Sequence, residues 1–162
     1  MRARGRLVCA ALLASVWIAL PRASGALGSD WSRYRPAQLR EVAEDLPGQR
    51  GVSVSGDVPV RSRLAFVREF RHLSEDSRRL IGAWGDSMGV PGMLEVFRRE
   101  VRVRQGDREY WLPVQEALAT AMEAELRARE VIEVFVIYIG RVDGRAVFLV
   151  NAFDHEGAHG HR

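Results

Sequence analysis

The sequence predicts an α+β fold in which five strands form a curved antiparallel sheet that is packed by helices. Polar and apolar residues alternate between positions 58 and 71, which indicates a strand with one side facing solvent. Two later segments, 74–88 and 114–130, carry apolar residues at helical spacing. Asp143-Gly144 lies between two apolar runs and is typical of a β-hairpin turn. These segments indicate a single mixed domain over residues 58–153.

The region before this domain, residues 27–57, is expected to hold one short helix and a connector. Pro36 suits the first position of a helix over residues 31–46. Four apolar residues share one face of that helix: Leu39, Val42, Ala43 and Leu46. Pro47-Gly48 ends the helix, and the glycine- and serine-rich connector that follows is interpreted as carrying a short strand over residues 52–55.

The first strand of the domain is followed by a helix whose start is well marked. Ser74 is a suitable N-cap, because its hydroxyl can accept a backbone hydrogen bond. Glu75 and Asp76 then place negative charge at the positive end of the helix dipole. Gly89 and Pro91 indicate where this helix ends.

Two further strands come next, over residues 94–104 and 108–112, and the helix that begins at Val114 follows them. In "REYWLPVQ" the aromatic residues Tyr110 and Trp111 are adjacent, so a strand points their rings to opposite sides. Pro113 is expected to end this strand. At most one of the two rings is therefore free to bind a ligand.

The predicted order of elements resembles the OB-fold. Residues 131–140 are almost continuously apolar, and residues 146–153 follow the hairpin turn, so five strands are predicted. The OB-fold is a five-stranded, partly open Greek-key barrel, and in this chain one helix lies between the third and fourth strands. An extra helix lies between the first and second strands, and the N-terminal helix precedes them. The resemblance covers residues 58–153 and implies an outer face that binds oligonucleotides or oligosaccharides; a general curved antiparallel sheet packed by helices is the alternative.

The C-terminal half also carries the pattern "YWLPVQ…G…VFLVN-F". In this pattern the chain resembles exported bacterial proteins of unknown function, over about residues 58–153. The resemblance implies export, and it implies no activity, cofactor or site residue.

The first 26 residues are interpreted as a secretory signal peptide. An arginine-rich start precedes an uncharged apolar run of 14 residues, from Leu7 to Leu20. This run is too short to cross a hydrocarbon core of ~30 Å comfortably, and Pro21 and several small residues follow it. Cleavage is predicted after Gly25 or Ala26, which would release a periplasmic or secreted domain. A retained N-terminal anchor is the alternative.

Charge and cysteine usage exclude several function classes. All 24 basic side chains are arginine, and four of them precede the predicted cleavage point. The mature chain then holds 20 arginines against 21 acidic residues, a net charge of −1, without the basic excess typical of nucleic-acid binders. The only cysteine, Cys9, lies in the signal peptide. A disulfide, a thiolate nucleophile and a cysteine metal site are therefore not expected in the mature domain.

The sequence contains no recognisable catalytic pattern. No serine lies in a Gly-x-Ser-x-Gly motif, and "GDSMGVPG" lacks the spacing and the lysine of a phosphate-binding loop. Five glutamates on predicted strands leave a carboxylate-based glycosidase open, although most are expected on solvent-facing sides beside arginines. They are Glu69, Glu95, Glu100, Glu109 and Glu133. We expect neither enzymatic activity nor a cofactor.

Arginines on the predicted strands are the best candidates for a binding surface. If the strands are neighbours, they gather guanidinium groups and one aromatic ring on an outer sheet face, which suits recognition of a polymer. The predicted ligand-binding residues are Arg61, Arg63, Arg98, Arg102, Arg104 and Trp111. The alternative is a solvated ladder in which neighbouring glutamates neutralise these arginines.

The C-terminal segment, residues 154–162, holds three of the four histidines. His155, His159 and His161 are candidate metal ligands, because imidazole suits Zn, Ni and Cu. Gly157 and Gly160 disfavour a helix that would bring these side chains together. A flexible tail with incidental metal affinity is the alternative.

These observations predict an exported, non-enzymatic binding or accessory module of the bacterial cell envelope. Its partner would be an envelope polymer or an envelope protein, and nucleic acid is not expected. The second hypothesis is a metal-binding or metal-dependent protein that uses the histidine tail.

Overall fold

The computed structural model describes residues 31–45 and 51–155. The expected signal peptide, residues 1–26, lies outside the described residues, as does most of the expected tail, including His159 and His161. Within the described part the mixed α+β class is confirmed, with a sheet of six strands and four α-helices. No helix in this part of the chain is long and apolar enough to cross a membrane.

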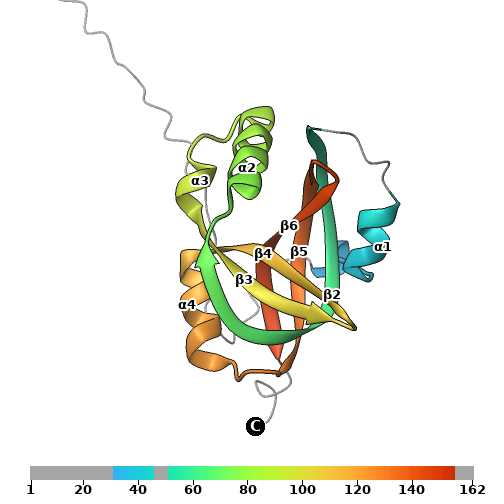
Figure 1. Ribbon diagram of the computed structural model, residues 1–162, viewed down its shortest axis with the longest axis vertical. Coiled ribbons are helices and arrows are strands. Elements are labelled where there is room, and N and C mark those ends of the chain that lie inside the picture. Colours follow the sequence, from blue (N-terminus) through green and yellow to red (C-terminus); the bar gives the residue numbers. More distant parts are fainter. Residues whose placement is uncertain (1–30, 46–50, 156–162) are drawn as a thin grey trace, which may run out of the picture.

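The sheet curves into a partial ring (Figure 1). Its strands are β1 (Arg35–Pro36), β2 (Val52–His72), β3 (Phe97–Gln105), β4 (Arg108–Gln115), β5 (Val131–Val142) and β6 (Arg145–His155). They lie in the order β1-β2-β3-β4-β6-β5, and β5 also pairs with β2. The pairs β1–β2 and β4–β6 are parallel, and the others are antiparallel. The strand count differs from the predicted five because the two residues of β1 pair with Val60 and Arg61.

β2 joins the two halves of the ring, because it pairs with two different strands along its length. Residues 52–65 pair with β5, and residues 65–72 pair with β3. The register to β3 shifts between Phe66 and Phe70, where Arg68 has a φ of 64°. A bulge bends a strand and increases its twist, so one strand can turn from one neighbour to the other. The short strand expected over residues 52–55 is the beginning of β2.

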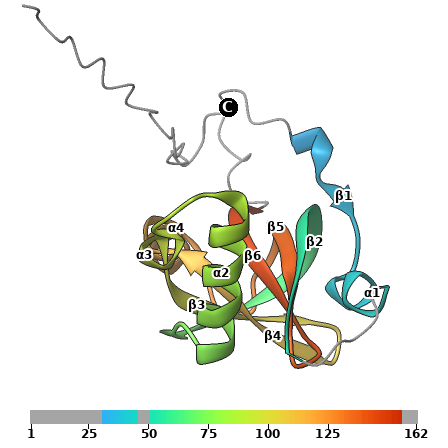
Figure 2. The same ribbon diagram turned by 90° about the horizontal axis from the view of Figure 1, so that it is seen from above.

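The N-terminal segment lies along the outside of β2 (Figure 2). It starts with a 3₁₀ turn, η1 (Trp31–Arg33), continues into β1, and ends in α1 (Leu39–Glu44). α1 is shorter than the predicted helix, because Pro36 pairs with Arg61 instead of opening the helix. Leu39 and Val42 of α1 are buried in the core, as their shared face predicts.

The other helices follow the predicted positions with different ends. They are α2 (Glu75–Met88), α3 (Met93–Val96) and α4 (Glu116–Glu125). α2 begins after the predicted N-cap, Ser74, whose hydroxyl accepts a hydrogen bond from the Ser77 N–H. α3 was not predicted, and it delays the start of β3 from residue 94 to Phe97. α4 ends before residue 130, since Leu126 has an extended backbone.

Pro113 does not end its strand, contrary to prediction. β4 continues to Gln115, and Pro113 pairs with Glu100 of β3. On its other side β4 pairs with β6 only at Val114. A proline is tolerated at such a position, because its missing N–H interrupts no continuous ladder there.

The buried side chains form two clusters. The larger cluster fills the ring and includes side chains from α1 and α4, which lie at opposite sides of the ring in Figure 1. The smaller cluster joins Leu80, Ile81 and Trp84 of α2 to Ile139, Val147 and Leu149 of the last two strands. α2 therefore packs on the outer side of the β5–β6 hairpin (Figure 2). Asp143 and Gly144 connect these strands, as the hairpin signal predicted.

We predict that Gly140→Ala destabilises the fold strongly, because β2 and β5 approach each other closely at this residue. Gly140 has a φ of 141°, and a Cβ atom there would lie 2.0 Å from the Ser53 carbonyl oxygen. Overpacking and backbone strain together predict a loss of about 3 kcal/mol in the free energy of unfolding, measured by denaturant titration.

Gly82→Ala in α2 is the matched control. Its Cβ would have no neighbour nearer than 3.9 Å, and alanine in a helix interior should raise stability by about 0.5–1 kcal/mol. Equal denaturation midpoints for Gly140→Ala and the unmodified protein would contradict the close contact between β2 and β5 at Gly140.

Candidate functional site

The outer sides of β2, β3 and β4 carry a group of charged residues around one aromatic ring. We call this surface the Trp111 face. It consists of Glu69, Arg71, Glu100, Arg102, Arg104, Glu109 and Trp111. The strand register brings these residues together, because Arg71 pairs with Glu100, Arg102 with Trp111, and Arg104 with Glu109. Alternate residues, such as Val101, Val103 and Leu112, point into the ring and form its core.

Glu100 anchors this face, although its side chain is only 1% exposed. Both Nε and Nη2 of Arg71 lie 2.6 Å from Glu100 Oε2. The hydroxyls of Ser74 and Ser77 donate to the other oxygen, Oε1, at 2.8 Å and 2.5 Å. Ser74 and Ser77 form the first turn of α2, so the carboxylate also lies at the positive end of that helix. One buried charge thus connects the end of β2, the middle of β3 and the start of α2.

This arrangement does not resemble a catalytic serine site. Both hydroxyls donate to Glu100, and the same carboxylate is already ion-paired with Arg71. Ser77 and Glu100 are only 5% and 1% exposed, so a substrate could not reach the Ser77 hydroxyl. The two serines hold α2 in place through Glu100.

Trp111 lies close to two guanidinium groups that are paired with carboxylates. The Cζ atom of Arg71 lies 4.1 Å from the centroid of the Trp111 ring, and that of Arg102 lies 5.9 Å from it. Arg102 donates to Glu69 at 2.6 Å and forms a second ion pair with Glu109. The hydrogen bonds with Glu109 and Glu69 raise the pKa of Arg102, so its guanidinium stays charged. The ring is half-buried.

The charges on the Trp111 face balance. Three arginines, Arg71, Arg102 and Arg104, accompany three glutamates, Glu69, Glu100 and Glu109. A balanced surface of this size provides no strong positive potential that would attract a polyanion over a distance. The geometry therefore favours short-range recognition over electrostatic steering.

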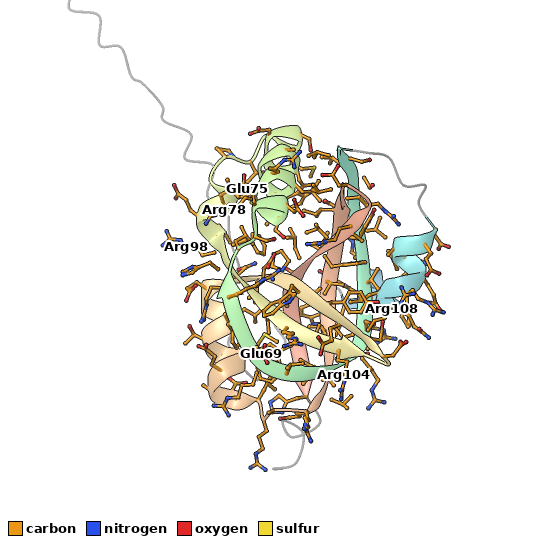
Figure 3. All side chains as sticks on the ribbon, viewed as in Figure 1. Glu69, Glu75, Arg78, Arg98, Arg104 and Arg108 are labelled. Carbon is orange, nitrogen blue, oxygen red and sulfur yellow. The ribbon has the colours of Figure 1, made fainter. Side chains whose placement is uncertain are left out.

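The predicted arginines do not all lie on this face. Arg102, Arg104 and Trp111 do, whereas Arg61 and Arg63 lie on the part of β2 that pairs with β5, opposite Phe135 and Glu133. The sixth predicted residue, Arg98, lies near α3, apart from Arg104 in Figure 3, and its Nε donates to the Glu95 carbonyl at 3.1 Å.

Sequence reasoning missed the part that Arg71 plays. The sequence pattern placed Arg71 on the same side of the strand as Arg61 and Arg63. It did not show that β2 changes its neighbouring strand after residue 65. Because of that change, Arg71 lies beside Glu100 and Trp111, while Arg61 and Arg63 lie beside β5.

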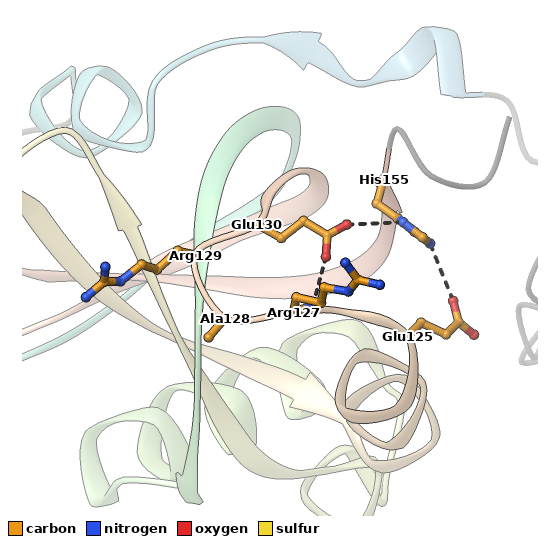
Figure 4. Close-up of a pocket in the computed structure, with 6 residues that line it drawn as sticks. All are labelled: Glu125, Arg127, Ala128, Arg129, Glu130 and His155. Atoms are coloured by element: carbon orange, nitrogen blue, oxygen red, sulfur yellow. Dashed lines mark hydrogen bonds and ion pairs between the residues drawn. The ribbon is translucent and has the colours of Figure 1, made fainter. Parts of the chain in front are cut away.

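His155, one of the predicted metal ligands, lines a cavity of about 560 Å³ between the end of β6 and the α4–β5 connection (Figure 4). Its Nδ1 atom lies 3.3 Å from Glu130, and its Nε2 atom lies 3.9 Å from Glu125. The two carboxylates thus face opposite nitrogens of the ring, which is the geometry of ion pairing and does not converge on one point. In the described ranges no cluster of three potential ligands could hold a metal ion. His159 and His161 lie outside those ranges, so the predicted metal site of the tail stays a prediction.

Comparison of the chain with protein-family models, with curated proteins and with solved structures found no match. The function of the protein is therefore inferred from its own residues and their geometry.

We predict that Glu100→Gln destabilises the protein by about 2 kcal/mol, because it removes the charge that Arg71 and two hydroxyls are arranged around. Arg71 is 40% exposed and regains some hydration, which keeps the loss below the roughly 3–5 kcal/mol of a fully buried ion pair. Denaturant titration measures the change in the free energy of unfolding.

Glu109→Gln is the matched control, since Glu109 is an exposed partner of Arg102. Its removal should change stability by no more than about 0.5 kcal/mol. If both variants unfold at the same denaturant concentration, Glu100 does not anchor α2 to the sheet.

Proposed function

We propose that this protein is a non-enzymatic binding module of the bacterial cell envelope, and that the Trp111 face binds an envelope protein. The observation that carries the proposal is a half-buried tryptophan flanked by two arginines, each of which is held by a carboxylate. Tryptophan and arginine are the residues that most often dominate the binding energy at protein interfaces. Because Arg71 and Arg102 are already ordered, a partner would lose little side-chain entropy on binding them.

The arrangement of strands supports this choice of surface. We infer that the ring β2-β3-β4-β6-β5 is an OB-like barrel. Along the chain, α4 lies between β4 and β5, and α2 and α3 are inserted between β2 and β3. Barrels of that class bind ligands on the outer side of their second and third strands. In this chain those strands are β3 and β4, which carry Arg102, Arg104 and Trp111.

A protein partner fits the Trp111 face better than a polymer. An oligonucleotide would need a basic excess, and the charges of this face balance. A sugar ring or base would need an open aromatic plane for stacking, but the guanidinium of Arg71 lies 4.1 Å from the centre of the Trp111 ring. Paired charges around a partly buried aromatic side chain suit the polar rim and apolar centre of a protein interface.

The proposed location follows from the start of the sequence. An arginine-rich N-terminus, an uncharged and mostly apolar run of 14 residues and a small-residue cleavage region support export by a signal peptide. We propose that the domain acts in the periplasm or outside the cell after cleavage.

We predict that the double variant Trp111→Ala/Arg102→Ala loses its envelope partner. The mature domain, immobilised on beads, is incubated with detergent-solubilised envelope from its host, and the bound proteins are quantified by mass spectrometry over a range of bait concentrations. Loss of a central tryptophan–arginine pair should weaken the specific interaction by about 30-fold or more, equivalent to ~2 kcal/mol.

Arg145→Ala is the matched control, because Arg145 lies in the β5–β6 hairpin and its side chain is 69% exposed. This variant should retain the partner, and thermal unfolding should show that both variants are folded. Equal recovery of the partner by the double variant and the control would contradict a protein-binding Trp111 face. Binding of the unmodified domain to delipidated cell-wall polymer in place of any protein would favour the polymer alternative.

A further inference from the structure

A second surface with the features of a ligand site lies where the first part of β2 pairs with β5. A cavity of about 260 Å³ opens on the outer side of the sheet where Pro59 of β2, Ile137 of β5 and Asn151 of β6 form its floor. The N-terminal segment forms one wall with Trp31, Arg33 and Tyr34. None of the binding residues predicted from the sequence lines this cavity.

The aromatic wall is held in place by a third ring. The centroid of Phe135, which is buried, lies 4.6 Å from that of Trp31 and 5.5 Å from that of Tyr34. Trp31 and Tyr34 are only half-buried, so part of each ring remains available to a ligand in the cavity. Aromatic rings fixed at the edge of a small cavity are a common feature of small-molecule sites.

Hydrogen-bonding groups of both kinds surround the same cavity. Asn151 Nδ2 donates to Tyr34 Oη at 2.7 Å, which leaves the Tyr34 hydroxyl hydrogen as a donor and the Asn151 carbonyl as an acceptor. Burial raises the pKa of Tyr34, so its phenol stays protonated at neutral pH. Asp57 accepts from Trp84 Nε1 at 2.9 Å, which orients a carboxylate that can accept further hydrogen bonds.

We propose that this cavity binds a single sugar ring. A sugar presents C–H groups that pack on aromatic rings, and hydroxyls that both donate and accept hydrogen bonds; Trp31, Tyr34, Asp57 and Asn151 match these needs. The volume lies just below the ~300 Å³ at which sites for drug-sized ligands begin, so the cavity itself has room for one ring. A purely apolar ligand would leave Asp57 and Asn151 without the hydrogen bonds they lose with water.

The proposal does not depend on the Trp111 face, because the two surfaces use different parts of β2, different neighbouring strands and different tryptophans. The mature chain after residue 26 contains three tryptophans, Trp31, Trp84 and Trp111. Trp31 lines the cavity, and Trp84 donates a hydrogen bond to Asp57 of the cavity lining. Trp111 belongs to the Trp111 face. Their indole N–H signals therefore report separately on the two surfaces.

The test is an NMR titration of the ¹⁵N-labelled mature domain with the methyl glycosides of glucose and N-acetylglucosamine. We expect saturable shifts of the Trp31 and Trp84 indole signals with at least one glycoside, and no shift of the Trp111 signal. Tyr34→Phe keeps the ring and removes the hydroxyl, which would donate to the sugar and which also accepts from Asn151, so it should weaken binding about tenfold. Trp111→Phe is the control and should bind the glycoside with unchanged affinity.

The proposal is overturned if neither glycoside shifts the Trp31 and Trp84 signals, or if Tyr34→Phe binds as tightly as the unmodified domain. It is equally overturned if cyclohexanol, which has the ring and one hydroxyl, produces the same shifts at the same concentration. A shift of the Trp111 signal alone would place the sugar on the other face. Failure of this titration leaves the envelope pull-down unaffected, so the two proposals fail independently.

Discussion

The buried carboxylate of Glu100 is the interaction on which the arrangement of the other parts depends. A charge that is 1% exposed is stable only when its hydrogen bonds are satisfied. Arg71, Ser74 and Ser77 satisfy it from two different elements. The end of β2 and the start of α2 are therefore held against β3, and the same contact places the Arg71 guanidinium over Trp111. The same Glu100 interactions thus stabilise the fold and shape the proposed binding face.

The second constraint is the path of β2. This strand pairs with β5 along its first part and with β3 along its last part, and the bulge around Arg68 lies near the change of neighbour. β5 completes the ring by approaching β2 so closely at Gly140 that a side chain has no room there. As a result, β2 contributes Arg71 to the Trp111 face and Asp57 to the proposed sugar cavity.

The two proposed sites differ in the way that their polar groups are used. On the Trp111 face the carboxylates are occupied by arginines, which gives an ordered surface with balanced charge and suits a partner that matches it in shape. In the cavity, Tyr34 and Asn151 satisfy each other only in part, and each keeps hydrogen-bonding capacity for a ligand. This difference is the reason for assigning a protein partner to the Trp111 face and a small polar ring to the cavity.

Local signals in the sequence were sufficient for much of the secondary structure. Ser74 as N-cap, the Asp143-Gly144 turn and the opposite orientation of Tyr110 and Trp111 depend on neighbouring residues, and all three were predicted correctly. The place of Pro113 within β4 was not predictable, because it depends on how little β4 pairs with β6. The two sites also depend on contacts between residues that are distant in the sequence. Arg71 donates a hydrogen bond to Glu100, 29 positions away, and Asn151 donates one to Tyr34, 117 positions away. Residue order specifies which side of a strand a side chain occupies, but only the folded sheet decides which strand lies beside it.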